Sequence, residues 1–142
     1  MTLRSAICIL SMVVVVVATS CISHHTSVVV DTPPHSWHEP VELAYHNEDT
    51  LRVRDFRIVT YYSAEAPDSA KFEVVTVSPD GFKATDTVIC WFPHQKAGRN
   101  YFERQTTFRT EAVLRCKGTY NVTFTPTDTL NGVWAVGLNT TF

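Results

Sequence analysis

Apolar and polar residues alternate with a period of two along most of this chain. Val41, Leu43 and Tyr45 alternate with Glu42 and the small residue Ala44, and the segment 120–125 alternates in the same way between apolar and polar residues. A period of two puts the apolar side chains on one face of a β-strand, whereas a helix needs a period near 3.6. No segment keeps the helical period over three turns. The pattern therefore predicts half-buried strands.

About seven or eight short strands are expected, separated by turn signals. Their ranges are 41–45, 51–62, 71–77, 83–92, 101–108, 110–116, 120–125 and 133–142. The clearest turn is Ser78-Pro79-Asp80-Gly81, in which proline fixes one φ and glycine accepts a positive φ, so a hairpin should follow. These signals predict an all-β fold, an antiparallel β-sandwich of jelly-roll or immunoglobulin-like type, with a closed barrel as the alternative.

Three strands carry finer predictions. Apolar positions change parity between Val53 and Phe56, which predicts either a β-bulge near Asp55 or two strands that meet there. The strand 83–92 is apolar on both faces towards its end, which is typical of a covered central strand. In the last strand, Trp134 has the parity of the apolar residues that follow it, so it is expected to face the core with them.

The first 21 residues have the order of a secretory signal. Arg4 is followed by an apolar run from Ala6 to Val17, too short to span a bilayer as a helix, and then by small residues before Cys21. Small residues followed directly by cysteine resemble a bacterial lipobox, in which the cysteine is acylated. The alternative is ordinary cleavage after Ser20. Residues 1–20 are thus predicted to be a signal peptide, and Cys21 a lipidation site.

The segment 21–35 contains two histidines, a valine run and Pro33-Pro34, and is predicted to be a tether. The alternative is that Val28–Val30 forms a first edge strand. With the tether interpretation, the single folded domain covers residues 36–142.

Composition restricts the function further. The chain has 142 residues and a formal net charge of −2, without a basic tract, which argues against nucleic acid as a partner and against charge-driven binding to anionic lipid. No histidine or cysteine spacing indicates a metal site, and no cofactor motif is present. Candidate reactive residues such as Ser63, Asp80, Asp86 and His94 have no motif around them. No catalytic residue is assigned, and a non-enzymatic protein is expected.

Three stretches together resemble the GldH family of gliding-motility lipoproteins. They are Ser36-Trp37-His38, then Ser78-Pro79-Asp80-Gly81 followed by Thr85-Asp86-Thr87, and finally Gly118-Thr119-Tyr120 with the run Leu130-Asn131-Gly132-Val133-Trp134-Ala135-Val136-Gly137-Leu138. The resemblance covers residues 36–142 in the same order and at similar spacing.

This resemblance implies a small lipoprotein of the Bacteroidota cell envelope without known catalysis. It implies a lipid anchor, a location on the outer membrane facing the periplasm, and other envelope proteins of the gliding or type IX secretion machinery as partners. The alternative function is a lipoprotein that binds glycans or another ligand through exposed aromatic side chains.

Two sets of residues are candidates for specific roles. Cys90 and Cys116 both end expected strands and could form a disulfide in an oxidising compartment, or stay as two buried thiols. Tyr61, Tyr62 and Trp37 flank expected loops and are the candidates for partner contact. Either tyrosine could instead cap the core. Trp91 and Trp134 lie in strongly apolar strands and are expected to pack inside.

Overall fold

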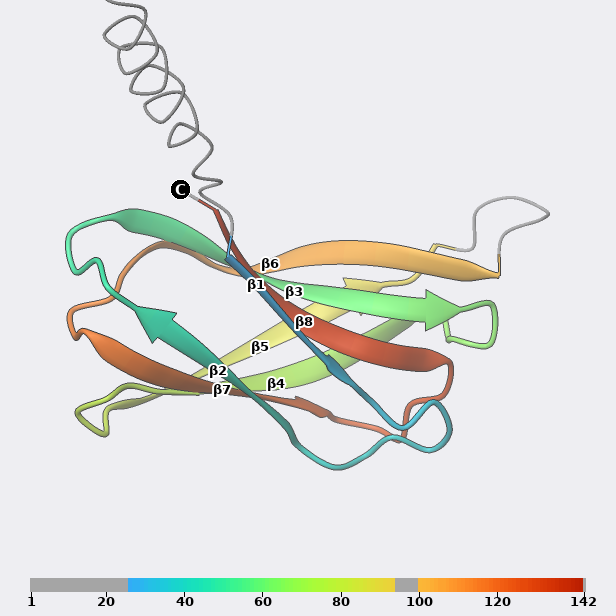
Figure 1. The fold of residues 1–142 in the computed structure, drawn as a ribbon. Helices are drawn as coiled ribbons and strands as arrows, with labels where there is room; N and C mark the ends of the chain where they lie inside the picture. The colour runs from blue at the N-terminus through green and yellow to red at the C-terminus, as the bar shows by residue number, and fades with distance from the viewer. Residues whose placement is uncertain (1–25, 94–99, 142) are drawn as a thin grey trace, which may run out of the picture.

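The structure is a computed structural model that describes residues 26–93 and 100–141. The described residues form eight antiparallel strands. The strands are β1 (Thr26–Asp31), β2 (Val41–Asn47), β3 (Val53–Ser63), β4 (Ser69–Val77), β5 (Lys83–Trp91), β6 (Tyr101–Val113), β7 (Gly118–Pro126) and β8 (Val133–Thr141). One sheet has the order β1-β8-β3-β6 and the other has the order β2-β7-β4-β5, and the two pack face to face (Figure 1). The predicted antiparallel β-sandwich is confirmed.

The connectivity is that of a jelly roll. Every connection passes from one sheet to the other except the β4–β5 hairpin, which is the predicted Ser78–Gly81 turn. The first and last strands are neighbours, since β1 pairs with β8 along its full length. Two separate sheets with this order correspond to the jelly-roll form of the prediction, not to the immunoglobulin-like form or to the closed barrel.

The core lies between the two sheets and follows the alternation of the sequence. In β2, Leu43 and Tyr45 are buried while their neighbours are exposed, and in β7 the alternate residues from Tyr120 to Phe124 are buried in the same way. Burying a large apolar side chain contributes about 1.5–3 kcal/mol, so these strands are held to one register by their inward faces.

The expected start of the domain at Ser36 is wrong. β1 lies inside the predicted tether and completes the sheet against β8, with Val28 and Val30 packed on the core. The alternative, an edge strand through Val28–Val30, is therefore the correct one. Alternation of one polar and one apolar face is hard to recognise in so short a valine run.

The expected central position of residues 83–92 is also wrong. β5 is an edge strand, paired only with β4, and its outer side chains Ile89 and Trp91 are 51% and 60% exposed. The bulge predicted near Asp55 is correct only in its place: the extra residues belong to β6, whereas β3 keeps one face buried through Arg54, Phe56 and Ile58, and Val53 faces outward. The register of β3 against β6 shifts around Phe56, and Glu111 opposite has a positive φ of 51°. The carboxylate of Asp55 accepts a hydrogen bond from the Glu111 amide at 3.0 Å and so holds the bulge.

The connections gather at two ends of the sandwich. The distal end, as we call it, carries the β1–β2, β3–β4, β5–β6 and β7–β8 connections, whereas the proximal end carries β2–β3, β4–β5 and β6–β7. β1 begins beside the end of β8, on the side of the molecule that leads to the proximal end (Figure 1).

Candidate functional site

An aromatic cluster lies on the outer face of the β1-β8-β3-β6 sheet, near the distal end. Trp134 of β8 packs against Tyr61 of β3 with ring centroids 5.4 Å apart and planes tilted by 47°. Tyr101 of β6 meets Trp134 edge-on, at 5.8 Å and 80°. Tyr101 is 67% exposed and Trp134 is 37% exposed. The rings of Trp134 and Tyr101 are thus nearly perpendicular to each other and form a corner on the outer face of the sheet.

A β-bulge turns Trp134 outward. Along β3, Tyr61 is opposite Ala135 and the next residue, Tyr62, is opposite Val133, so β8 has one extra residue at Trp134. Both flanking residues are buried while Trp134 reaches the surface. Bulges often re-aim a side chain next to a functional site. The bulge therefore exposes a large aromatic side chain that regular alternation along β8 would have buried.

A hollow of about 540 Å³ opens beside this corner. We call it the aromatic hollow. It is lined by Pro34, Ser63, Glu65, Tyr101, Gly132 and Trp134. The rings and the proline supply apolar walls, and the hydroxyl of Ser63 and the carboxylate of Glu65 supply polar groups. A few polar groups among apolar walls are typical of sites that bind small ligands.

Gly132 joins the connections that form the hollow. Its amide donates a hydrogen bond to the Pro34 carbonyl at 3.0 Å, and its carbonyl accepts one from the Ser63 amide at 2.8 Å. Its φ is +80°, and a Cβ at this position would lie 2.3 Å from the Ala66 nitrogen. Only glycine fits such a close approach with a positive φ.

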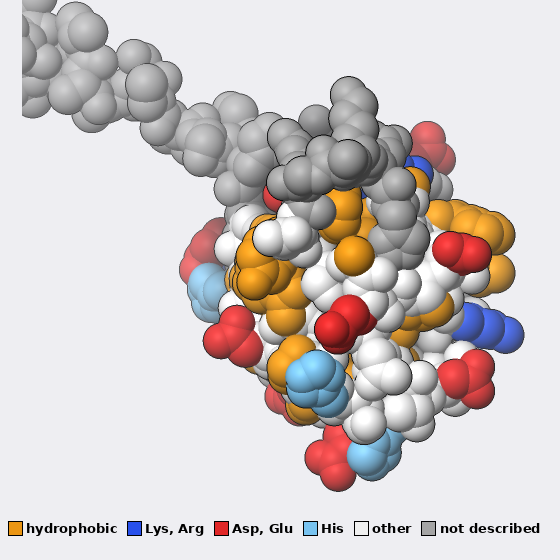
Figure 2. Space-filling view, turned by 90° about the vertical axis from the view of Figure 1, so that its right-hand side faces the viewer, with side chains coloured by type: hydrophobic (Ala, Val, Ile, Leu, Met, Phe, Trp, Pro, Cys, Tyr) orange, Lys and Arg blue, Asp and Glu red, His pale blue; other side chains and the backbone are white. Residues whose placement is uncertain are grey.

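The distal end is acidic among its described residues. Its connections contain Glu39, Glu65, Asp68 and Asp128 with His35 and His38, and no Lys or Arg outside the undescribed residues 94–99. Figure 2 looks onto this end, where carboxylates and histidines are scattered between hydrophobic patches. An acidic rim disfavours anionic ligands and is compatible with neutral ones.

The hydroxyl of Tyr61 remains a hydrogen-bonding group at any ordinary pH. Burial raises the pKa of Tyr61, and the nearby Glu103 carboxylate raises this pKa further. Because both effects favour the neutral phenol, the side chain at the base of the cluster keeps its proton.

The three predicted contact residues have different positions. Tyr61 is half-buried beneath Trp134, so it belongs to the cluster. Tyr62 is buried, donates its hydroxyl proton to the Pro93 carbonyl at 2.9 Å and packs on Phe92, so it caps the core as the alternative had it. Trp37 is also buried, at 1% exposure, and the expectation that it contacts a partner is wrong.

The assignment of the other two tryptophans to the core is wrong as well. Trp91 is exposed because β5 is an edge strand, and Trp134 is exposed because of the bulge. Tyr101 was not expected to be functional at all. The only signal for it in the sequence is its place at the end of a weakly patterned strand, next to a loop.

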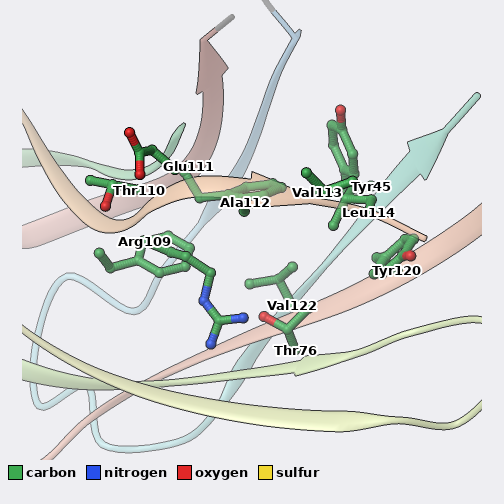
Figure 3. A pocket seen from close by; sticks show the side chains of 12 residues that line it. Tyr45, Thr76, Arg109, Thr110, Glu111, Ala112, Val113, Leu114, Tyr120 and Val122 are labelled. Carbon is green, nitrogen blue, oxygen red and sulfur yellow. The ribbon is translucent and has the colours of Figure 1, made fainter. Parts of the chain in front are cut away.

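A second cavity enters the sandwich between the two sheets at the proximal end. It measures about 380 Å³, and Figure 3 shows the C-terminal half of β6 arching over it. A neighbouring hollow of about 490 Å³ shares part of its lining, including Arg109, Leu114 and Tyr120. The deeper walls are apolar, with Phe56, Phe108 and Val122 among them.

Three polar side chains that line this cavity are paired with neighbouring groups of the protein. Arg109 pairs with Asp86 at 2.9 Å. The hydroxyl of Tyr120 accepts a hydrogen bond from the Cys116 amide at 3.1 Å, and Tyr45 accepts one from Arg54 at 2.5 Å. A nucleophile needs an adjacent base that is oriented by a third group. The described residues of this cavity contain no such arrangement.

Of the two alternatives for Cys90 and Cys116, the structure has the free thiols, with Cys90 buried and Cys116 half-buried. Cys116 lines a hollow together with Ala84 at the start of β5, whereas Cys90 lies further along that strand, about 20 Å from Ala84 in extended chain. A disulfide requires Cα atoms within about 7 Å. Burial raises the pKa of Cys90 to about 11, against a smaller opposing effect of a hydrogen bond with Thr106.

The two thiols should therefore differ in reactivity. In the folded protein at pH 8, iodoacetamide should alkylate Cys116 at least about tenfold faster than Cys90, because Cys90 is buried and protonated. Peptide mass mapping after timed alkylation gives both rates. Equal rates, or a disulfide-linked pair of peptides that contains Cys90 and Cys116 when reductant is left out, would contradict the two free thiols.

Cys21 lies outside the described residues, so its lipidation stays a prediction. Among the described residues, no group of histidine, cysteine and acidic side chains is arranged to hold a metal ion. No helix in the described ranges is long and apolar enough to cross a membrane.

No protein-family model matches the sequence, and no curated protein matches it. Among solved structures, the chain is similar to one from infectious bursal disease virus strain Gx, with 6% identity and a TM-score of 0.43 over 83% of this chain. It is also similar to a β-sandwich carbohydrate-binding module described as promiscuous, with 14% identity and a TM-score of 0.38 over 82% of this chain. The chain spans 32% and 52% of those two chains. Such low scores carry no argument about function.

Proposed function

We propose that this protein binds neutral glycans in the aromatic hollow, without catalysis. The observation that carries the proposal is the corner of Trp134 and Tyr101, two exposed rings at 80° to each other beside a hollow. A sugar ring has an apolar face of C–H groups and a polar edge of hydroxyls. It can stack on one aromatic wall while its hydroxyls reach Glu65 and Ser63.

The angle between the rings favours the end of a glycan chain. A flat row of aromatic side chains would accept the middle of a long chain, whereas a corner stops the chain against the second wall. The acidic rim favours sugars without carboxylates. The hollow thus fits a terminal, uncharged sugar unit.

Binding without hydrolysis is part of the proposal. Glycoside hydrolysis uses a pair of carboxyl groups about 5–9.5 Å apart on either side of the scissile bond. Among the described residues that line the hollow, Glu65 is the single carboxylate.

The cellular setting remains as the sequence predicts it. A lipid anchor at Cys21 would hold a glycan-binding domain in the cell envelope. The role in gliding motility or type IX secretion that the GldH resemblance implies stays a prediction, because no geometric feature of the described residues favours it.

Affinity electrophoresis tests the proposal. The full chain should be retarded in gels that contain neutral polysaccharides with many chain ends, such as dextran or glycogen, and not in gels that contain polygalacturonate. Trp134→Ala should weaken this binding by at least about tenfold, because a stacking aromatic is a typical hot spot.

Trp91→Ala is the matched control. It removes an exposed tryptophan from the edge of the opposite sheet and should leave the retardation unchanged. Equal effects of the two variants, or no retardation by any of these polysaccharides, would contradict glycan binding in the hollow.

A further inference from the structure

The proximal end carries exposed apolar side chains on all three of its connections or beside them. Leu51 is 87% exposed in the β2–β3 connection, and Phe82 is 70% exposed in the β4–β5 hairpin. Val53 at the start of β3 and Val113 at the end of β6 are 51% and 43% exposed. Exposed apolar residues that cluster mark interaction surfaces more often than single ones do.

These four residues, which we call the proximal patch, lie at the same end of the sandwich. Val53 and Val113 are directly opposite each other in the β3–β6 ladder, and Leu51 precedes Val53 by two positions. Phe82 and Val113 line the same hollow of about 490 Å³. The patch therefore runs from one sheet to the other across the proximal end.

The position of β1 brings this end close to the predicted lipid anchor. Thr26, the first residue of β1, is aligned with Thr140, which is in turn aligned with Phe56. Leu51 lies about 15 Å beyond Phe56 along an extended chain. The segment 21–25 between Cys21 and β1 can span at most about 17 Å. A fully extended segment directed toward the proximal end would therefore let an acyl group on Cys21 reach about the depth of the β2–β3 connection.

The charges of the two ends also favour the proximal end as the one that faces the membrane. The three proximal connections contain three acidic residues, Glu48, Asp49 and Asp80, and three basic ones, Arg52, Arg115 and Lys117. The described distal connections contain four acidic residues and no Lys or Arg. The proximal end is the one of the two that a phospholipid surface would not repel.

We propose that the proximal patch docks on the phospholipid bilayer that holds the lipid anchor, with Leu51 and Phe82 inserted at the headgroup level. The inference rests on acylation of Cys21 and is independent of glycan binding. The acyl chains that a lipobox cysteine carries would hold the protein at the bilayer, and an apolar patch on the folded domain is a second contact that fixes its orientation there. Docking of this end turns the aromatic hollow at the distal end away from the bilayer.

Depth-dependent quenching tests the orientation in the full chain. The acylated protein carrying Cys116→Ser, purified from host membranes, is placed in vesicles of phosphatidylethanolamine and phosphatidylcholine. An NBD fluorophore is attached at Leu51→Cys or, for the distal end, at Thr129→Cys. Doxyl-labelled phosphatidylcholine should quench the reporter at position 51 at least about twofold more than the reporter at position 129.

Two further substitutions separate docking from mere tethering. Phe82→Glu should reduce the quenching at position 51 towards that at position 129, whereas Ile89→Glu, an exposed apolar residue outside the patch, should not. Equal quenching at the two positions overturns the proposal, and so does a chain that fails to float with the vesicles. Shielding of position 51 in native membranes but not in lipid vesicles would assign the patch to a protein partner and would also overturn it.

Discussion

Trp37→Ala should lower the free energy of unfolding by about 3–5 kcal/mol, the range for removing a large aromatic side chain from a core. Trp37 is 1% exposed and its ring packs on Phe72 at 5.6 Å. Its indole N–H donates a hydrogen bond to the Glu39 carbonyl at 2.7 Å, and its backbone pairs with Leu130 in an isolated bridge. The substitution would leave a cavity and an unpaired carbonyl. Urea unfolding followed by circular dichroism measures the loss.

Trp91→Ala provides the comparison for this result. It removes the same atoms from a side chain that is 60% exposed, so the expected loss is within about 0.5 kcal/mol. If the two variants were equally stable, Trp37 would not anchor the β1–β2 connection to the core. A normal stability of Trp37→Ala together with lost partner binding would restore the surface role that the sequence suggested.

The fold class could be predicted because several short segments of the chain each carry a pattern that is typical of β-strands or hairpins. Alternation in β2 and β7 and the Ser78–Gly81 turn each depend on a few adjacent residues, and the structure has both. Strands and hairpins of this kind are short-range features. The sequence carries them without reference to the rest of the sandwich.

The order of the strands could not be read in this way. Whether β5 is central or at an edge depends on which strands pair with it across the chain, and its apolar outer face favoured the wrong answer. The same holds for β1, whose partner β8 lies at the opposite end of the sequence. Long-range pairing is decided by the packing of the whole sandwich, and a strand contains little information about it.

The candidate site was hidden for a related reason. Trp91 and Trp134 were assigned to the core from the apolarity of their strands and Trp37 to the surface from its place beside an expected loop, and the structure has each of them the other way round. The exposure of Trp134 needs a bulge that shows only in the pairing of β8 with β3. The hollow itself combines Pro34, Glu65 and Gly132 from three connections, which no sequence spacing could join. The sequence did indicate that some aromatic side chains are exposed, and it named one residue of the cluster, Tyr61.

Gly132→Ala should destabilise the protein by about 3 kcal/mol or more and should also weaken glycan binding. A positive φ costs a non-glycine residue about 1–2 kcal/mol, and a methyl group forced into packed backbone costs about 1–3 kcal/mol more. At Gly132 both apply, because the new Cβ would lie 2.3 Å from the Ala66 nitrogen and would push the β3–β4 connection away from the hollow. The midpoint of urea unfolding and the retardation in dextran gels measure the two effects.

Gly81→Ala is the control that shows the cost of backbone strain without a steric clash of the new Cβ. Gly81 has a φ of +87°, close to that of Gly132, but a Cβ there would meet no atom within 4 Å. We therefore expect a loss of only about 1–2 kcal/mol and unchanged retardation in dextran. If both variants lost the same stability, backbone strain alone would account for Gly132, and the close packing of Ala66 would contribute nothing. If Gly132→Ala bound dextran normally despite its lower stability, the contact between the β3–β4 and β7–β8 connections would not shape the glycan site.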